Sequence, residues 1–503
     1  MSLTEFVSSD LTPELAKVRD QIRRYAQDFG LDFFDVIFEM VDHEQINSLA
    51  ALGGFPVRYP HWRFGMDYDQ LSKGYTWGLQ KIYEMVINTN PAYAYLMKSN
   101  NLVDQKTVIA HVYGHVDFFK HNYWFSQTNR KMLDTMANHA VKIRNYMDLY
   151  GQDKVENFID HCLALENLID PYLPFSTSKR RSDKEDTEAE EKKALEPGRL
   201  KTDRQYMDHY INPPDFLEDQ KKRIEDQAKK SKKNPSEPQK DVLLFLIENA
   251  PMEQWEREVL AIVREESYYF APQAQTKIMN EGWASYWHSK IMTEKALKDS
   301  EVIDFSDHHA GTMSMQPGRV NPYKVGIELF RDIEDRWNRG KFGKEYEECD
   351  DMVIKAKWDK KLNLGRQKIF EVRRVCNDVT FMDEYLTEEF VERLKLYTYA
   401  FNRRTNQYEI AERDFKKVKE KLLFQITNLG QPFVYVSDGN FQNKGELLLS
   451  HKHQGLDLDV RWSRETMRSL SEIWKRPVNV ETEVDGQKKL FSYHNGEFSE
   501  KFL

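Results

Sequence analysis

Hydrophobic positions in the first 175 residues recur mostly at helical spacing. The segment SDLTPELAKVRDQIRRYAQDFG contains Thr12 and Pro13, which favour a helix start, and ends at Gly30, which favours a stop. A second stretch, from Gln70 to Val86, carries apolar residues along one helical face. Between them lies GGFPVRYPHWRFG, whose glycines, prolines and rings predict a rigid aromatic loop. We therefore expect residues 1–175 to be mainly helical.

Helical spacing returns after residue 240. It runs through DVLLFLIENAPMEQWEREVLAIVREESYYF and NEGWASYWHSKIM, and again around Val325–Trp337 after a glycine-bearing loop, HHAGTMSMQPGRVNPY. Residues 176–240 are instead charged, of mixed sign and poor in apolar residues, which predicts a charged insertion or linker.

The pattern changes again near Leu386. Six short runs with strand-like composition are interleaved with two helical stretches, near Arg413–Phe424 and Ser463–Trp474. This order is typical of a small α+β domain. We predict a mainly α-helical body over residues 1–385, containing a metalloprotease-like helix pair, and a smaller C-terminal α+β domain over residues 386–503.

Composition excludes several classes of protein. The 503 residues carry a formal net charge of −9, which argues against broad nucleic-acid binding. Three widely separated cysteines indicate neither a disulfide framework nor a CxxC metal site, and they fit a reducing compartment. The N-terminus lacks the features of a signal peptide, and no apolar run reaches membrane-spanning length. We expect a cytoplasmic protein without membrane insertion.

The strongest chemical signal is a pair of histidines, His111 and His115, in HVYGH. Positions four apart on a helix share one face, so two imidazoles can bind one divalent ion. Gly114 between them is unfavourable inside a helix, and we expect close packing to account for it. The alternative is two partly buried histidines that only form hydrogen bonds.

A second segment favours the metal interpretation. Asn280 to Ala284, NEGWA, resembles segments that supply the third, carboxylate ligand in several zinc hydrolase families, which here is Glu281. The small residues of this helix would let it approach another helix closely. Two histidines and one glutamate leave a coordination position open, as in catalytic zinc sites. His288 lies seven residues after Glu281, which is too far along the helix for both side chains to bind the same ion. We expect His288 to contact one of the ligand side chains or the substrate.

One departure from the hydrolase pattern is serious. The general-base glutamate would follow the first histidine, but Val112 stands there and cannot accept a proton. Glu265 and Glu266 are the predicted catalytic substitutes, and Glu84 and Asp117 are further candidates. Each of these carboxylates could instead be a surface or capping group.

The aromatic loop offers a possible anion site. Arg58, His61 and Arg63 lie beside aromatic planes, and paired arginines can bind a carboxylate or phosphate. The loop could equally be a structural clamp in which the arginines cap helix C-termini. We therefore predict that the side chains that contact the metal ligands or the substrate are Arg58, His61 and Arg63 of this loop, together with His288.

Several long strings identify the chain as a member of the SpoVR (stage V sporulation protein R) family by resemblance. They include AALGGFPVRYPHWRFGMDY, AHVYGHVDFFKHNYWF and QTKIMNEGWASYWH. The resemblance covers residues 30–385 and extends through the C-terminal domain. It implies a bacterial sporulation protein involved in spore cortex formation, with a broader role in relatives that form no spores. It also implies a partnership with a PrkA-type kinase and a YhbH-type protein, but no established reaction.

Three functions remain open at this point. The first is a metal-dependent hydrolase that uses His111, His115 and Glu281 to hold a divalent metal, with zinc expected and manganese or iron as alternatives. The second is a non-catalytic scaffold or regulator, which the valine at position 112 favours. The third is a redox-active iron site, because two histidines and one carboxylate also bind non-haem iron.

Overall fold

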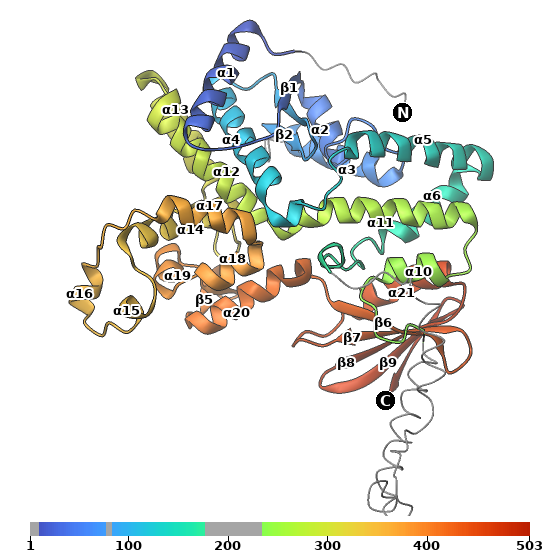
Figure 1. Cartoon of the computed structure of the whole chain (residues 1–503). Coiled ribbons are helices and arrows are strands. Elements are labelled where there is room, and N and C mark those ends of the chain that lie inside the picture. Colours follow the sequence, from blue (N-terminus) through green and yellow to red (C-terminus); the bar gives the residue numbers. More distant parts are fainter. Residues whose placement is uncertain (1–9, 77–82, 177–233) are drawn as a thin grey trace, which may run out of the picture. The chain divides into compact units, whose positions relative to one another are not determined.

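A computed structural model of the protein describes residues 10–76, 83–176 and 234–503 (Figure 1). Within these ranges the protein is mostly helical, with a small sheet-containing C-terminal region, as predicted. The chain forms two compact units, Met1–Val155 with Tyr268–Gly430, and Glu156–Ser267 with Gln431–Leu503. Most of the charged segment predicted at 176–240 lies outside the described residues. The predicted domain boundary near residue 386 stays a prediction.

The first unit opens with a helix and a small sheet. Helix α1 spans Pro13–Asp28, and the Thr12 hydroxyl caps it by accepting from Leu15 N at 3.3 Å. Strands β1 (Val36–Val41), β2 (Glu84–Ile87) and β3 (Ala92–Met97) form a sheet in the order β1-β3-β2, with β1 parallel and β2 antiparallel to β3. Helices α2 (His43–Ala51) and α3 (Trp62–Thr76) lie between β1 and β2 in the sequence.

Two expectations for this region are wrong. The helix predicted from Gln70 to Val86 ends at Thr76, and residues 84–87 form β2, because a short apolar run fits either period and here pairs with β3. Residues 77–82 lie outside the described part. The aromatic segment is also partly helical, because α3 begins at Trp62. Pro60 disfavours helical backbone angles at the residue before it, and it does not prevent a helix from starting two residues after it.

The remaining elements of the first unit are mostly helices. They are α4 (Leu102–His121), η1 (Tyr123–Phe125), α5 (Met132–Tyr150), α12 (Lys277–Ile291), the π-helical η5 (Met292–Ala296), η6 (Asp299–Glu301), α13 (Val302–Thr312), α14 (Pro322–Arg339), α15 (Lys344–Glu347), α16 (Met352–Ala356), α17 (Gly365–Val375), α18 (Asp378–Tyr385), α19 (Glu388–Leu394), β4 (Thr398–Asn402), β5 (Gln407–Glu412), α20 (Phe415–Ile426) and η7 (Thr427–Gly430). Strands β4 and β5 form a two-stranded antiparallel sheet of their own.

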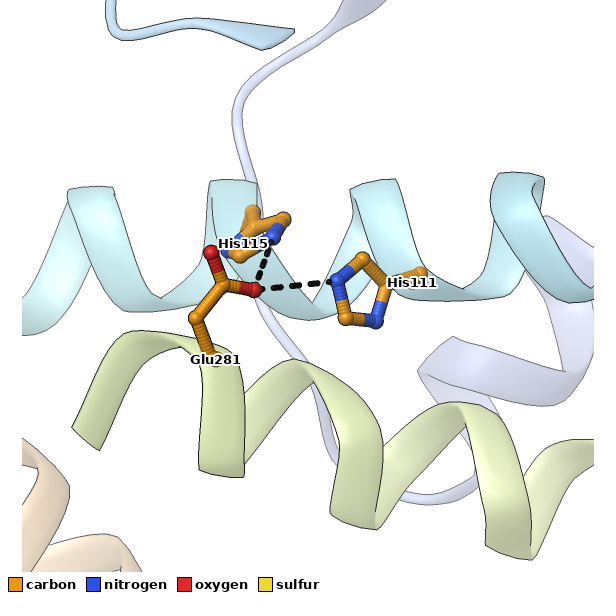
Figure 2. A group of neighbouring side chains, drawn as sticks. All are labelled: His111, His115 and Glu281. Atoms are coloured by element: carbon orange, nitrogen blue, oxygen red, sulfur yellow. Dashed lines mark ion pairs between the residues drawn. The ribbon is translucent and has the colours of Figure 1, made fainter. Parts of the chain in front are cut away.

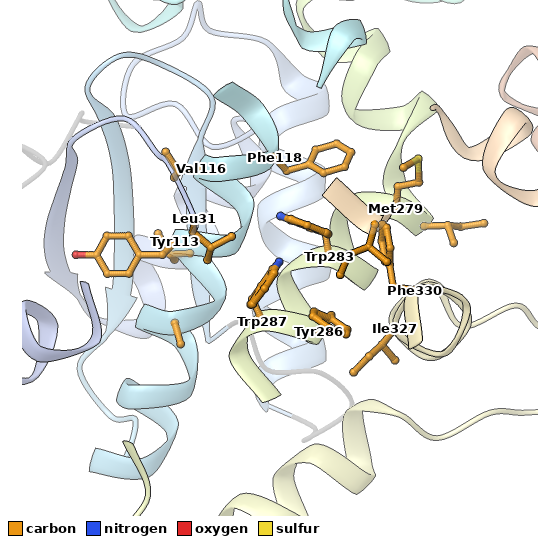
Figure 3. Close-up of a cluster of buried hydrophobic side chains, with 14 of the residues drawn as sticks. Leu31, Tyr113, Val116, Phe118, Met279, Trp283, Tyr286, Trp287, Ile327 and Phe330 are labelled. Atoms are coloured by element: carbon orange, nitrogen blue, oxygen red, sulfur yellow. The ribbon is translucent and has the colours of Figure 1, made fainter. Parts of the chain in front are cut away.

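The core of the first unit is built on α12, which packs against both α4 and α14. Trp283 and Trp287 of α12 are fully buried in this core, and the ring centroid of Trp283 lies 5.3 Å from that of Phe330 of α14 (Figure 3). Burying this many large rings supplies much of the hydrophobic stabilisation of the unit. The helix that carries Glu281 is therefore packed on two sides by other helices of the core.

Glycines bring these three helices together. A Cβ added at Gly114 would lie 2.7 Å from Ala284 Cα, so α4 and α12 approach at backbone distance. Gly282 and Gly326 face each other in the same way between α12 and α14. The expected close-packing role of Gly114, and of the small residues in NEGWAS, is confirmed.

The second unit contains a five-stranded sheet. Its strands are β6 (Phe433–Phe441), β7 (Glu446–Lys452), β8 (Val478–Val484), β9 (Gln487–His494) and β10 (Glu497–Phe502), in the order β10-β9-β8-β7-β6. Only β7 and β8 are parallel, and α21 (Val460–Trp474) connects them. The unit also includes α6 (Gln152–Leu163), η2 (Leu173–Phe175), α10 (Val242–Asn249) and α11 (Gln254–Gln275), the first and last of which cross its boundary.

The predicted C-terminal strands and helices are confirmed, with two differences. Strand β10 was not predicted, because GEFSEKFL is short and mostly polar. The first predicted strand pair, β4 and β5, packs in the first unit with α20, whose Val418 is buried in that core. Among the described residues, no helix has the length and apolar character needed to cross a membrane.

Candidate metal centre

Helices α4 and α12 bring three predicted ligands together. His111 and His115 project from successive turns of α4, and Glu281 projects toward them from α12 (Figure 2). Glu281 Oε2 lies 3.4 Å from Nε2 of His111 and 3.5 Å from Nε2 of His115. One ligand atom from each of the three residues lies within 4.8 Å of the others.

These distances suit shared coordination better than direct hydrogen bonding. An N–H···O bond spans about 2.7–3.2 Å, shorter than either contact. A tetrahedral zinc ion with bonds of about 2.0–2.2 Å places neighbouring ligand atoms about 3.3–3.6 Å apart. Glu281 Oε2 is buried and makes no hydrogen bond to a described residue. The three side chains therefore fit a divalent ion at their centre.

The cluster is buried and electrostatically coupled. His111 and His115 are 5% and 6% exposed, and the Glu281 side chain is 19% exposed. Burial by itself would raise the pKa of Glu281, but its interactions with the adjacent imidazoles of His111 and His115 lower this pKa well below its usual range. Burial opposes protonation of His115, yet Glu281 raises the pKa of this imidazole. A carboxylate facing two imidazoles is thus the stable charge state of the cluster.

Two outer contacts orient the histidines. His115 Nδ1 lies 2.9 Å from Asn280 Oδ1, so Nδ1 carries the proton and Nε2 presents its lone pair to the centre. His111 Nδ1 lies 2.9 Å from His288 Nδ1. Burial and the neighbouring histidines lower the pKa of His288 well below its usual value, so a neutral His288 can accept this hydrogen bond. Both ligands then direct Nε2 toward Glu281.

Two further side chains adjoin the three. Tyr323, in the first turn of α14, has its ring 6.1 Å from that of His111, and its phenol interacts with Glu281. Burial, followed by the charges of Glu281 and Glu84, raises the pKa of Tyr323. Glu84 of β2 is partly buried, and its carboxyl interacts electrostatically with His111, His115 and Glu281. Burial raises the pKa of Glu84, against the opposing effect of the histidines.

The N-terminus of α12 is capped from another helix. Thr276, at the N-cap position, makes no side-chain cap. Asp378, the first residue of α18, instead accepts from the backbone N–H groups of Ile278 and Met279, both at 2.9 Å. This contact fixes the first turn of the helix, which starts four residues before Glu281.

Asp378 leads to a prediction for the pH dependence of stability. Burial raises the pKa of Asp378 to about 7, against the lowering effect of its N–H donors. Since the unfolded pKa is about 3.9, the folded state retains a proton that the unfolded state releases. The resulting stabilisation is present at acidic pH and is lost as pH rises through 7. Relative to Asp378→Asn, the native protein should lose about 1–3 kcal/mol of unfolding free energy between pH 5 and 8. Urea unfolding at both pH values measures this, and a pH-independent difference would contradict it.

The other predicted acids differ in their surroundings. Glu265 and Glu266 lie on α11 in the second unit, the former exposed and the latter buried. Asp117 is fully buried and accepts from Trp283 Nε1 at 2.8 Å and Asp32 N at 2.9 Å, beside Arg373. Asp117 is therefore a structural acceptor between α4 and α12, and a catalytic role for Glu265 or Glu266 stays a prediction.

The aromatic loop has contacts of its own. The Arg58 guanidinium lies over the rings of Tyr59, Phe64 and Phe270, at 4.5–5.8 Å from their centroids. His61 is buried, and its Nδ1 accepts from Arg63 N at 3.3 Å. These contacts involve ring faces, so the anion-binding role of the loop and the alternative clamp, in which the arginines cap helix C-termini, both stay predictions.

Sequence reasoning missed Asn280 and Tyr323. Asn280 directly precedes Glu281. A side-chain amide next to a predicted metal ligand could have indicated a residue that forms a hydrogen bond to a ligand histidine. Tyr323 carried no signal, because its approach to Glu281 depends on how α14 packs on α12.

Comparison with known proteins places the chain among one set of relatives. Residues 10–431 match the family described as SpoVR like protein. The chain is 30% identical over 497 residues to "Uncharacterized protein YcgB" of Escherichia coli (strain K12), covering 93% of this chain and 92% of the relative. No solved structure matches the chain.

Proposed function

The chain belongs to the SpoVR family, and we propose that it is a divalent-metal protein whose ion is held by His111, His115 and Glu281. The observation that carries this proposal is the convergence of two Nε2 atoms on one buried carboxylate oxygen, at 3.4 and 3.5 Å. Donor type favours zinc, with manganese or iron as alternatives.

A metal-dependent hydrolase is the activity that this donor set supports best. A divalent ion with an open position supplies Lewis acidity and activates water. The glutamate that usually follows the first histidine is replaced by Val112, which is fully buried in the core. Glu84 is the carboxyl best placed to accept a proton instead, because it interacts with all three ligands from β2. Tyr323 would orient Glu281 from the opposite helix.

Genetic complementation, combined with metal analysis, tests this function. Glu84→Gln should keep the metal but lose function in a strain that lacks the chain, whereas His111→Ala should lose both. A folded protein with both His111→Ala and Glu281→Ala that has lost its metal yet restores full function would rule out metal-dependent catalysis.

Asn280 provides a test of the outer contacts. Asn280→Leu removes the acceptor that holds the His115 tautomer, and such changes cost about 10–100-fold in metal affinity. Competition with a chromophoric chelator measures the affinity. Asn145→Leu, at an exposed position of α5 in the same unit, is the matched control. Equal affinities for the two variants would remove Asn280 from the site.

The buried valine also favours a second function, that of a non-catalytic regulator. In that case the ion would only join α4 to α12, and other surfaces would recruit partners such as a PrkA-type kinase and a YhbH-type protein. Family membership also makes spore cortex formation the process in which to look for a phenotype. Co-purification distinguishes the two functions: a Glu84→Gln variant that keeps its partners and its function supports the regulator, and absence of both partners counts against it.

A further inference from the structure

A cavity of about 280 Å3 lies within the first unit, apart from the histidines. Its walls are the loop at residues 315–320, the turn and strand at 394–399, and one face of α20. The α20 residues recur at helical spacing, so a single stripe of that helix forms one wall: Val418, Lys421, Leu422 and Gln425. The volume is near the lower end of the roughly 300–1,000 Å3 typical of small-molecule pockets.

The charged lining of this cavity is entirely positive. Arg319, Lys395 and Lys421 come from three different segments, and no acidic residue lines the cavity with them. All three are exposed, and none forms an ion pair with a carboxylate in the described part of the chain. Three unneutralised cations around one small space create a local positive potential that favours an anion.

The deeper lining is apolar. Leu396 and Val418 are 6% and 1% exposed and belong to the core of the unit, and Val320 and Leu422 are partly buried. A ligand that satisfies both parts needs an anionic group at the mouth and a compact apolar body below it.

The walls are held in place before any ligand binds. Asn321 Nδ2 donates to the carbonyl oxygens of Thr312 and Ser314 at 2.9 and 2.8 Å, which fixes the loop. Lys395 adopts a left-handed conformation at the end of α19, and the Tyr399 hydroxyl donates to its carbonyl oxygen at 3.1 Å. Preformed walls reduce the entropic cost of binding.

From this arrangement we propose that the cavity binds a small organic anion, a phosphate or carboxylate joined to a compact apolar or aromatic body. Arg319, Lys395 and Lys421 would bind the anionic group, and the apolar lining would bind the body. This site is separate from the metal centre and does not depend on it.

The test uses para-fluorophenyl phosphate as the probe and fluorine NMR of the probe with the full-length protein. We expect saturable binding with a dissociation constant of about 1 mM or below, as for a fragment-sized ligand. Lys421→Met and Arg319→Gln should each weaken binding about five- to tenfold. Lys416→Met is the matched control, because Lys416 is an exposed cation on α20 that does not line the cavity. Thermal unfolding verifies the fold of each variant.

Competitors identify which part of the probe is recognised. Para-fluorobenzyl alcohol, which lacks the anion, should bind at least about tenfold more weakly than the probe, and inorganic phosphate should displace the probe only at high concentration. The proposal is overturned if binding does not saturate, if the alcohol binds as well as the phosphate, or if Lys416→Met and Lys421→Met weaken binding equally. Metal-depleted protein should bind the probe normally, which keeps this result independent of the metal centre.

Discussion

Glu281→Gln is expected to reduce the metal content of the purified protein from about one equivalent to below about 0.1. Glutamine keeps the shape of the side chain but removes the charge and the anionic oxygen that faces both Nε2 atoms. Loss of a direct ligand should cost more than the about 10–100-fold typical of outer partners. Elemental analysis after chelator-free purification measures the content.

Matched controls separate loss of a ligand from general damage. Glu294→Gln changes an exposed glutamate just beyond α12 and should leave the metal content unchanged. His494→Ala, at an exposed position on β9, is the corresponding control for His111→Ala. A Glu281→Gln protein that retains a full equivalent of metal would place the ion elsewhere in the chain.

Gly282→Ala is expected to destabilise the first unit by about 3 kcal/mol or more. The added methyl would collide with the backbone of Gly326 and with Ile327 N, and backbone atoms of a packed helix cannot move aside as a flexible side chain can. Pushing α14 away from α12 would also disturb Tyr323 and the neighbouring Glu281. Thermal unfolding should show a lower Tm, and the metal content should fall with it.

Gly311→Ala is the control for this substitution. Gly311 lies in α13, and a Cβ there would meet nothing within 4 Å. Alanine should therefore be neutral or stabilise by up to about 1 kcal/mol through helix propensity. If both variants have the same Tm as the native protein, α12 and α14 do not approach as closely as the structure indicates.

Local pattern was sufficient for the two helices that carry the site. The four-residue spacing of His111 and His115 indicated one helical face, and the resemblance of NEGWA to zinc-ligand segments singled out Glu281 across 165 residues of intervening chain. The small residues at 114 and 282 indicated close helix contacts. These features could be predicted from the sequence because each depends on a single helix and the helix packed directly against it.

Other parts depend on distant contacts and could not be predicted. Strand β2 has no distinctive period, because four residues are too few to separate a strand from a helix. Asp378 caps α12 from about 100 residues away, and Tyr323 reaches Glu281 only through the packing of α14. The assignment of β4 and β5 to the first unit likewise follows from tertiary packing that strand propensity does not encode.

X-ray absorption at the edge of the metal found in the native protein tests the central claim most directly. The account predicts a first shell with two imidazole nitrogens at about 2.0–2.1 Å and a carboxylate oxygen at about 2.0–2.2 Å. It also predicts that His115→Ala, reconstituted with an excess of the same metal, gives a first shell with one imidazole fewer. A shell that contains sulfur, or one without imidazole, would contradict assignment of the ion to His111, His115 and Glu281.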